Sequence, residues 1–449
     1  MPARYLSRAD AEAIAQKVLS FSTADDARVN LFSTSTGNTR FAQNQVSTAG
    51  DTYDVNVTVT SAFGKRTASA TTNSLDDASL RALVQTSERL ARLVPEDPEY
   101  LGELPPQQYL PVEPFFDSTA DMTPADRARA VMQVAGPASR RNLLSTGYLF
   151  HSTNANAVAN KKGLFAYARG TRFNLSATVR TPDGTGSGWA SGGDNDWTRV
   201  DLAEVGARAI QKAEASRNPR AVEPGEWTVI LEPVAVANLV QLMANAMNAR
   251  PADEGRSFFS KQGGGNKIGE KFLDERISIT SDPADPRMPA GPFNGEGLPT
   301  GPVTWVQNGV LRDLFYNRFW AQRNNRQPNS FPGSWAMTGG NASMDEMIRS
   351  TDRGLLVTRM WYIRAVDPRT ILFTGLTRDG TFLIENGRIT TAVKNLRWNE
   401  SPIFLLNNIE MMSAPVRVNA DDGGEDGASV MVPAIKARDF TFSSLSDAV

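Results

Sequence analysis

The stretch YDVNVTVT, from Tyr53 to Thr60, alternates apolar and polar residues almost without a break. A period of two is typical of a strand that has one buried and one open face. Phe63-Gly64-Lys65 then turns the chain, and Arg66–Thr72 can return as an antiparallel partner. We therefore predict a strand pair here, flanked by a short strand at Val29–Ser33 and by helices at Ala9–Leu19 and Ser74–Leu93.

A similar pattern returns in the second quarter of the chain. Phe173–Arg180 reads FNLSATVR and lies 119 residues after Asp54–Ser61. Leu149-Phe150-His151-Ser152 resembles Leu31-Phe32-Ser33-Thr34 at an offset of 118 residues. Helices are predicted around this copy, at Pro124–Val134 and Asp201–Ala215. We infer an internal duplication of a strand-pair-plus-helix unit, with chance similarity as the alternative that one sequence leaves open.

Composition changes divide the chain further. Residues 1–95 are expected to form a first α/β unit, residues 96–118 a proline-rich linker, residues 119–217 a second unit, and residues 225–449 a β-rich C-terminal domain. Within the last of these, Trp227–Leu231 is predicted as a strand.

The C-terminal domain is predicted to be mainly antiparallel. Asn308-Gly309 and Asn386-Gly387 are hairpin signals between strand-like runs. Asp379-Gly380 is read as a third turn, so Leu355–Val393 is expected to form a four-strand meander. Ser343 and Glu346 form a capping box at the start of a short helix. The expected fold class is α+β, with duplicated strand-pair and helix units followed by a mainly antiparallel β domain that holds a buried helix.

Composition also excludes several kinds of site. The 449 residues include no cysteine and one histidine, so thiolate sites and sites that need two histidines are excluded. A net charge of −2 argues against direct nucleic-acid binding. Met1–Asp10 has no apolar signal core, and Val229–Met247 holds too many polar residues to span a membrane. We expect a soluble, cytoplasmic protein without membrane contact.

Two features invite a catalytic or cofactor interpretation. His151 could act as a lone general base, but it sits beside an apolar strand, and a structural role is the favoured interpretation. The glycine run Gly263-Gly264-Gly265-Asn266-Lys267 lacks the spacing and the strand-to-helix context of a dinucleotide site, so we interpret it as a loop.

The most apolar helix carries a polar stripe. Val234–Ala249 is apolar on nearly every side and should be buried. Its polar members Asn238, Gln241 and Asn245 are three and four residues apart and share one face. Buried amides need partners, so this stripe is predicted to line a cleft or an interface.

Several segments in register resemble the TldD/PmbA family, a peptidase-related family also described as modulators of DNA gyrase. In the first part of the chain the resemblance is looser and rests on Phe41–Val46 and Thr71–Val84. In the C-terminal half it is carried by Trp227–Asn248, Ser278–Gly297, Gly309–Tyr316, Gly354–Arg359, Gly380–Ile389 and Ser429–Phe440.

The resemblance also shows what this chain lacks. TldD-type members carry an HExxxH motif on the apolar helix, and a cysteine near the C-terminus completes their zinc site. The motif falls here on Val240, Gln241 and Asn245, and the cysteine region on Asp421–Ala428. Valine cannot bind zinc, and glutamine cannot serve as the general base. The chain is therefore similar to PmbA/TldE-type members, and we expect it to bind no metal, to hold no catalytic residue and to be inactive alone.

For such a member the resemblance implies a role in proteolysis. It implies a heterodimer with a TldD-type HExxxH subunit, which would hold the zinc and cut peptides or unfolded proteins while this chain helps to form the substrate cleft. Edge strands can bind an extended peptide through main-chain hydrogen bonds. Besides the helix amides, the candidate cleft residues lie in the loops at 261–267 and 283–297, and they are Lys261, Gly264, Asn266, Phe293 and Glu296.

Two other functions stay open. The chain could be an inactive scaffold or peptide-binding homodimer, including a modulator of gyrase that acts by protein contact. It could also be an independent hydrolase that uses His151.

Overall fold

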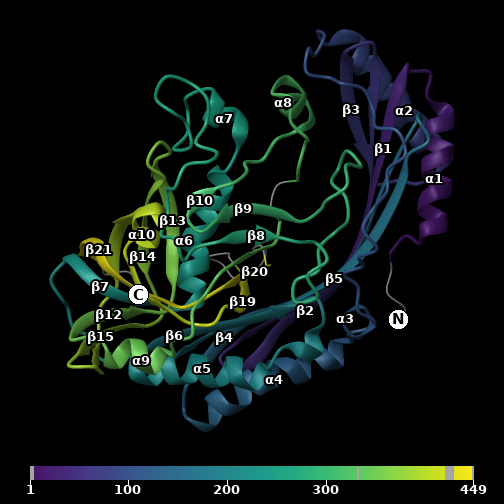
Figure 1. Cartoon of the computed structure of the whole chain (residues 1–449). Helices are drawn as coiled ribbons and strands as arrows, with labels where there is room; N and C mark the ends of the chain where they lie inside the picture. The colour runs from purple at the N-terminus through teal and green to yellow at the C-terminus, as the bar shows by residue number, and fades with distance from the viewer. Residues whose placement is uncertain (1–4, 331–332, 420–428, 447–449) are drawn as a thin grey trace.

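The computed structural model describes residues 5–330, 333–419 and 429–446. In this part of the chain the fold is mixed α+β, as predicted, and the strands form three mainly antiparallel sheets. A long, curved sheet from the first half of the chain bends around the C-terminal half, and helices lie along its outer side (Figure 1).

The curved sheet joins both predicted units. Over the described residues its strand order is β3-β2-β1-β4-β5-β6, so β1 and β4 pair antiparallel at its centre. The strands extend well beyond the predicted segments, because polar residues continue the alternation on one face. Their bounds are β1 Asp26–Ala42, β2 Gln45–Phe63, β3 Arg66–Thr72, β4 Leu144–Asn160, β5 Phe165–Arg180 and β6 Ser187–Asp194.

The two halves of this sheet repeat one arrangement. Each half consists of a helix, three strands and a helix, in that order along the chain. Ser35 lies opposite Thr153 in the β1–β4 pair, and these two residues are themselves 118 apart. An approximate twofold axis therefore passes through this pair, which agrees with the repeat inferred from the sequence.

Helices cover only the outer face of the sheet. The odd-numbered residues of β1, such as Val29 and Leu31, are buried with α1 and α2, while α4 and α5 pack on Leu149 and Leu175 of the second half. The even-numbered residues of β1 face the C-terminal half. The helices are α1 Arg8–Phe21, α2 Asp77–Leu93, α3 Asp117–Ala120, α4 Pro124–Arg140 and α5 Leu202–Ala215, with a 3-10 turn η1 at Trp197–Arg199.

Two further sheets build the C-terminal half. The order of one, over the described residues, is β10-β9-β8-β11-β20-β19, and the order of the other is β13-β14-β17-β21-β7-β12-β15-β16, with β18 beside β21. The first holds β8 Ile279–Ser281, β9 Val303–Gln307, β10 Val310–Leu311, β11 Trp335–Met337, β19 Val416–Asn419 and β20 Ser429–Val432. The second holds β7 Gly225–Leu231, β12 Arg353–Val357, β13 Met360–Asp367, β14 Leu372–Thr377, β15 Thr381–Glu385, β16 Arg388–Ala392, β17 Leu396–Glu400, β18 Ile409–Met412 and β21 Ile435–Leu445.

The predicted meander at 355–393 is wrong. The hairpins β13–β14 and β15–β16 form, but β12 pairs with β7 and β15, and β14 pairs with β17. Asp379-Gly380 therefore connects β14 to β15, which are not neighbours in the sheet. The strands pair with partners far along the chain, which local alternation does not encode. A buried ion pair, 2.9 Å from Arg359 to Asp379, joins the β12–β13 and β14–β15 connections. Both hairpins at Asn-Gly turns are confirmed, as is the capping box at Ser343.

The apolar helix is buried as predicted. This helix, α6 Pro233–Ala246, contacts strands of both C-terminal sheets. Every residue from Ala235 to Val240 is buried, and the surrounding core includes Trp305, Trp335 and Trp398. The remaining C-terminal helices are short: α7 Ala249–Asp253, α8 Arg318–Arg323, α9 Met344–Arg349 and α10 Pro402–Asn407.

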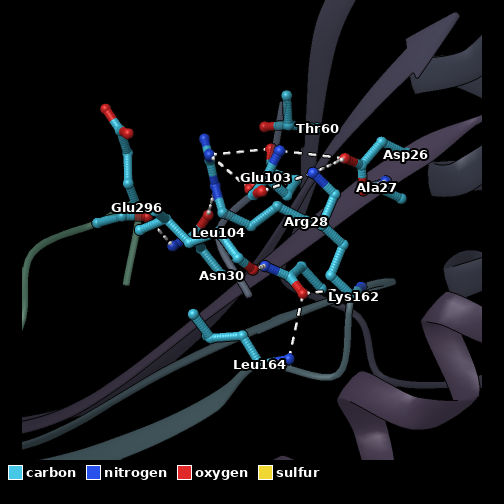
Figure 2. A network of polar contacts seen from close by, with 12 residues as sticks. Asp26, Ala27, Arg28, Asn30, Thr60, Glu103, Leu104, Lys162, Leu164 and Glu296 are labelled. Atoms are coloured by element: carbon cyan, nitrogen blue, oxygen red, sulfur yellow. Dashed lines mark hydrogen bonds and ion pairs between the residues drawn. The ribbon is translucent and has the colours of Figure 1, made fainter. Parts of the chain in front are cut away.

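The proline-rich segment is held by a buried acid. Figure 2 shows Glu103 pointing into the first sheet, where Arg28 of β1 donates to both carboxylate oxygens at 3.1 and 3.0 Å. The Glu103 amide donates to Asp26, and Lys162 donates to the Glu103 carbonyl oxygen at 2.8 Å. Burial raises the pKa of Glu103, and the charge of Arg28 opposes that rise. The segment is thereby clamped along the rim of the sheet.

Candidate functional site

A group of cavities lies between the first sheet and a C-terminal loop. Residues 289–295 cross the open face of the sheet and line three adjoining cavities of about 280, 420 and 480 Å³. Phe293 lines two of them, and Asn156 and Ala168 connect the first two. Cavities of this size can hold several residues of an extended peptide.

The floor of the groove combines uncharged amides with apolar side chains. Asn56, Phe32, Asn156 and Ala168 lie opposite one another across β2, β1, β4 and β5. Because strand side chains alternate between faces, the neighbouring rows on this side hold Asn30 with Thr58, and Asn154 with Thr34. Carboxamides both donate and accept hydrogen bonds, so this floor is suited to peptide groups.

The loop is fixed where it meets the sheet. Asn30 donates its side-chain amide to the Gly295 carbonyl oxygen at 2.8 Å, and the Tyr109 hydroxyl donates to that of Gly297 at 2.8 Å. The rings of Phe293 and Tyr109 are 5.4 Å apart, and Phe293 packs on the apolar cluster around Leu164. The groove therefore has a preformed aromatic wall.

One end of the groove is lined by three arginines, two of which pair with carboxylates. Arg169, Arg172 and Arg417 line the 420 Å³ cavity. Arg417 donates to Asp194 at 2.9 Å and to Asn195 at 2.8 Å. Burial lowers the pKa of Arg417, and the charge of Asp194 opposes that change. The hydrogen bond to Glu113 raises the pKa of Arg169.

The polar stripe on α6 is only partly buried. Asn238 is buried, Gln241 is half-buried and Asn245 is exposed. The Trp335 indole donates to Gln241 at 2.8 Å, and Gln241 donates to Asn245 at 2.8 Å. Val240 is fully buried in the core, so it presents nothing to a site.

These side chains do not fit a zinc site. A chain of indole and carboxamide groups offers zinc no imidazole, thiolate or carboxylate. Over the described ranges, no group of three or more His, Cys, Asp and Glu residues could hold a metal ion. The segment Asp421–Ala428, which matches the cysteine region of the family, lies outside the described residues.

The glycine loop lies in a different place. Lys261 forms an ion pair with Glu270 at 3.1 Å, and Gly264 is exposed with φ of +111°. Asn266 donates to Asp253 at 2.7 Å and to the Tyr316 hydroxyl at 3.1 Å. None of these loop residues lines the three cavities of the groove.

The predicted site residues thus fall into three groups. Gln241 and Asn245 bond to each other on α6, Asn266 anchors its loop to α7, and Phe293 lies in the groove. Glu296 follows Phe293 and forms an ion pair with Arg318 of α8 at 3.1 Å.

The prediction missed the amides on the floor of the groove and the arginines at its end. A signal was present, since Asn30, Asn56, Asn154 and Asn156 all fall on the polar phase of alternating strands. Which face of a sheet borders a groove depends on packing between distant segments, so that phase alone did not identify a site.

His151 lies on the opposite, helix-covered face of the sheet. It is 6% exposed, and the Arg127 guanidinium of α4 is 3.0 Å from its Nε2. Arg127 also forms two hydrogen bonds to Asp51, at 2.8 and 3.1 Å. Burial and the charge of Arg127 lower the pKa of His151 to about 4. A covered histidine cannot reach a substrate in the groove.

Family models match three consecutive parts of the chain. They are described as domain 1, the central domain and the C-terminal domain of PmbA/TldA metallopeptidases, at residues 27–91, 118–217 and 224–444. Together they define the class of protein as metallopeptidase-related. The chain belongs to the PmbA/TldD family.

Individual relatives agree with this assignment. A metalloprotease from Methanothermobacter thermautotrophicus is 23% identical over 338 residues, covering 70% of this chain and 72% of that protein. A Haemophilus influenzae metalloprotease PmbA homolog is 22% identical over 358 residues, covering 74% of this chain and 75% of that protein.

Solved structures show the same fold. TldE from Thermococcus kodakarensis superimposes with a TM-score of 0.82 at 18% identity, over 96% of this chain and 99% of that one. A Bacteroides thetaiotaomicron protein described as a modulator of DNA gyrase also reaches 0.82, at 19% identity, over 97% and 99% of the two chains. Among the described residues, no helix is long and apolar enough to cross a membrane.

Proposed function

We propose that this chain is the non-metal subunit of a TldD–TldE-type metallopeptidase complex that acts on peptides or unfolded proteins. The observation that carries the proposal is the hydrogen-bonded chain Trp335–Gln241–Asn245 on α6. It occupies the helix on which zinc-dependent members are expected to hold their metal, and it contains no zinc donor of the usual kinds. The zinc and the general base would come from a TldD-type partner.

The groove supports a role in substrate binding. The amides on its floor can bond to a peptide backbone without selecting particular side chains, and apolar floor residues such as Phe32 lie between them. The aromatic wall at Phe293 can cover apolar side chains of an unfolded segment. Likeness to TldE over nearly the whole chain is consistent with such an assembly, although 18% identity speaks for the fold alone.

Native mass spectrometry of the protein, purified gently from its own host, tests the proposal. The expected result is a complex with a partner of similar size that contains zinc. A metal-free protein that never captures such a partner would contradict it. That outcome would favour a peptide-binding scaffold, including one that modulates gyrase by protein contact.

Substitutions in the groove test the cleft. In the complex, Phe293→Ala should raise the KM for a peptide substrate several-fold, because it removes the aromatic wall. Phe404→Ala is the matched control, since Phe404 is an exposed phenylalanine on α10 that lines none of the three cavities. Deletion of residues 262–266 tests the glycine loop in the same assay. Unchanged peptide turnover in both the deletion variant and Phe293→Ala would show that neither segment lines the substrate cleft.

A further inference from the structure

A small cavity lies where helix α5 meets the C-terminal half of the chain. Its volume is about 150 Å³, and it is lined by residues of α5, by Glu232 before α6 and by residues of strands β12, β15 and β16. None of its described lining residues belongs to the groove, so the two are separate places in the molecule. A cavity of this size holds a molecule about as large as benzene.

Two cations on this cavity share one carboxylate oxygen. Arg208 and Lys212 are four residues apart on α5 and so lie on one face of the helix. Both donate to Oε2 of Glu232, at 3.0 and 2.7 Å. The other carboxylate whose charge acts on Lys212 is Asp379, which is already paired with Arg359 at 2.9 Å. Two positive charges at the cavity therefore face one negative charge.

Lys212 is also shielded from water. Its side chain is buried, and it donates to the Trp189 carbonyl oxygen at 3.3 Å as well as to Glu232. These contacts use two of the three N–H groups of the ammonium. Burial lowers the pKa of Lys212, and the charge of Glu232 opposes that change. A further negative charge in the cavity would therefore stabilise the ammonium.

The opposite wall of the cavity is apolar. Leu356 of β12 lies across from Phe382 of β15 in the second C-terminal sheet, and both are buried. Ile389 of β16 also lines the cavity and is exposed, although it is a large apolar residue. An inorganic anion gains nothing from such a wall, whereas an aliphatic chain buries apolar surface against it. The cavity thus combines cations on one side with an apolar surface on the other.

We propose that this cavity binds a small carboxylate with a short aliphatic body. The carboxylate accepts hydrogen bonds from Lys212 and Arg208, and the aliphatic part lies on Leu356 and Phe382. Among the residues that the structure describes, none donates to Oε1 of Glu232, so this oxygen can accept an amino group next to the carboxylate. Two sources share this chemistry: a free aliphatic amino acid such as leucine, and the matching acid without the amino group.

Isothermal titration calorimetry of the purified full chain, in a buffer free of carboxylates and phosphate, tests the site. The probes are leucine, isocaproate, which lacks the amino group, and leucinamide, which lacks the carboxylate. Saturable binding is expected for at least one of the two carboxylates, and binding of leucinamide should be at least about tenfold weaker. Tighter binding of leucine than of isocaproate identifies the amino acid as the ligand, and the reverse order identifies the simple acid.

Other results would overturn the proposal. One is the lack of saturable binding of either carboxylate up to about 10 mM, a concentration at which weak ligands are still detected. Another is binding of leucinamide or of inorganic phosphate as tight as that of the better carboxylate.

A matched pair of variants tests the role of the cations. Arg208→Met should weaken carboxylate binding at least about tenfold while the thermal midpoint changes little, because Arg208 is exposed. Arg141→Met is the control, since Arg141 pairs with Glu214 of the same helix at 2.9 Å but does not line the cavity. Equal losses in both variants would contradict the assignment. The measurement uses this chain without a partner subunit, so its result and that for the proposed peptidase complex are independent.

Discussion

His151 shows how one residue couples folding to pH. Its pKa is lowered from 6.5 to about 4 by burial and by the charge of Arg127. The folded protein therefore binds fewer protons than the unfolded chain between these values. The contribution of neutral His151 to the free energy of unfolding is fully present above pH 6.5. It decreases by roughly 3 kcal/mol in total as the pH falls toward 4.

Replacement by His151→Gln should remove this part of the pH dependence. Glutamine can still accept a hydrogen bond from Arg127, but it does not titrate. Urea unfolding at pH 5 and pH 7.5 should show a smaller difference in midpoint for the variant than for the wild type. Equal differences would mean that His151 is not held neutral.

Gly37 is required by the same cluster. It lies opposite His151 in the β1–β4 pair, and a Cβ added there would overlap Arg127 and His151. Gly37→Ala should cost about 1–3 kcal/mol through overpacking. At the symmetry-related position, Ala155 lies opposite Ser33. The double variant Gly37→Ala/His151→Ser recreates that pair and should be less destabilised than the sum of its single changes, as measured in a double-mutant cycle.

Glu400 should act in the opposite direction. It is 4% exposed, and burial raises its pKa from 4.5 to about 7, so the folded state binds the extra proton. That contribution is complete below pH 4.5 and is lost as the pH rises through 7. Between pH 6 and pH 8, the free energy of unfolding should fall by about 1 kcal/mol less in Glu400→Gln than in the wild type, as measured by urea titration. A parallel loss in both proteins would contradict the assignment.

At the scale of the element, α6 depends on one side-chain hydrogen bond. Gln241→Leu would leave the indole N–H of the buried Trp335 without its acceptor and should cost about 1–3 kcal/mol. Asn245→Ala is the control, because this exposed residue should change stability by no more than about 0.5 kcal/mol. Equal effects of the two changes, measured by urea unfolding, would show that the indole bond is not important for α6.

The elements themselves were largely predictable. Alternation identified β2 and β5, helical spacing identified α2 and α5, and the Asn-Gly turns identified two hairpins. These signals are local, since they depend on residues that are only a few positions apart in the sequence. The observed bounds differ from the predicted ones mainly where polar residues continue a strand, as in β1 after Ser33.

At the scale of the whole molecule, Glu103 connects the proline-rich segment to the first sheet. Glu103→Ala would remove the partner of Arg28 and release the segment from the rim. Limited proteolysis within residues 95–116 should become about tenfold faster or more, since a tenfold change corresponds to only about 1.4 kcal/mol of local stability. Glu96→Ala is the control, because Glu96 is exposed on the same segment. Unchanged cleavage in Glu103→Ala would show that other contacts hold the segment.

Strand order was the part of the fold that local patterns could not give. The strand-like runs of 355–393 are present, yet β12 and β14 pair with β7 and β17, and the buried pair of Arg359 and Asp379 joins the connections between these strands. Pairing between distant strands depends on packing and on loop closure, which are not visible in the alternation of residues.

The sequence by itself determined the α+β class, the repeated N-terminal unit, the buried helix α6 and the lack of zinc donors on it. Each of these follows from local spacing or from residue chemistry. The tertiary structure alone decided that Asn30, Asn56, Asn154 and Asn156 line a groove and that His151 is covered by α4. Asn30 bonds to Gly295, 265 positions away, and Arg127 reaches His151 from a separate helix, so only the folded chain brings these residues into contact.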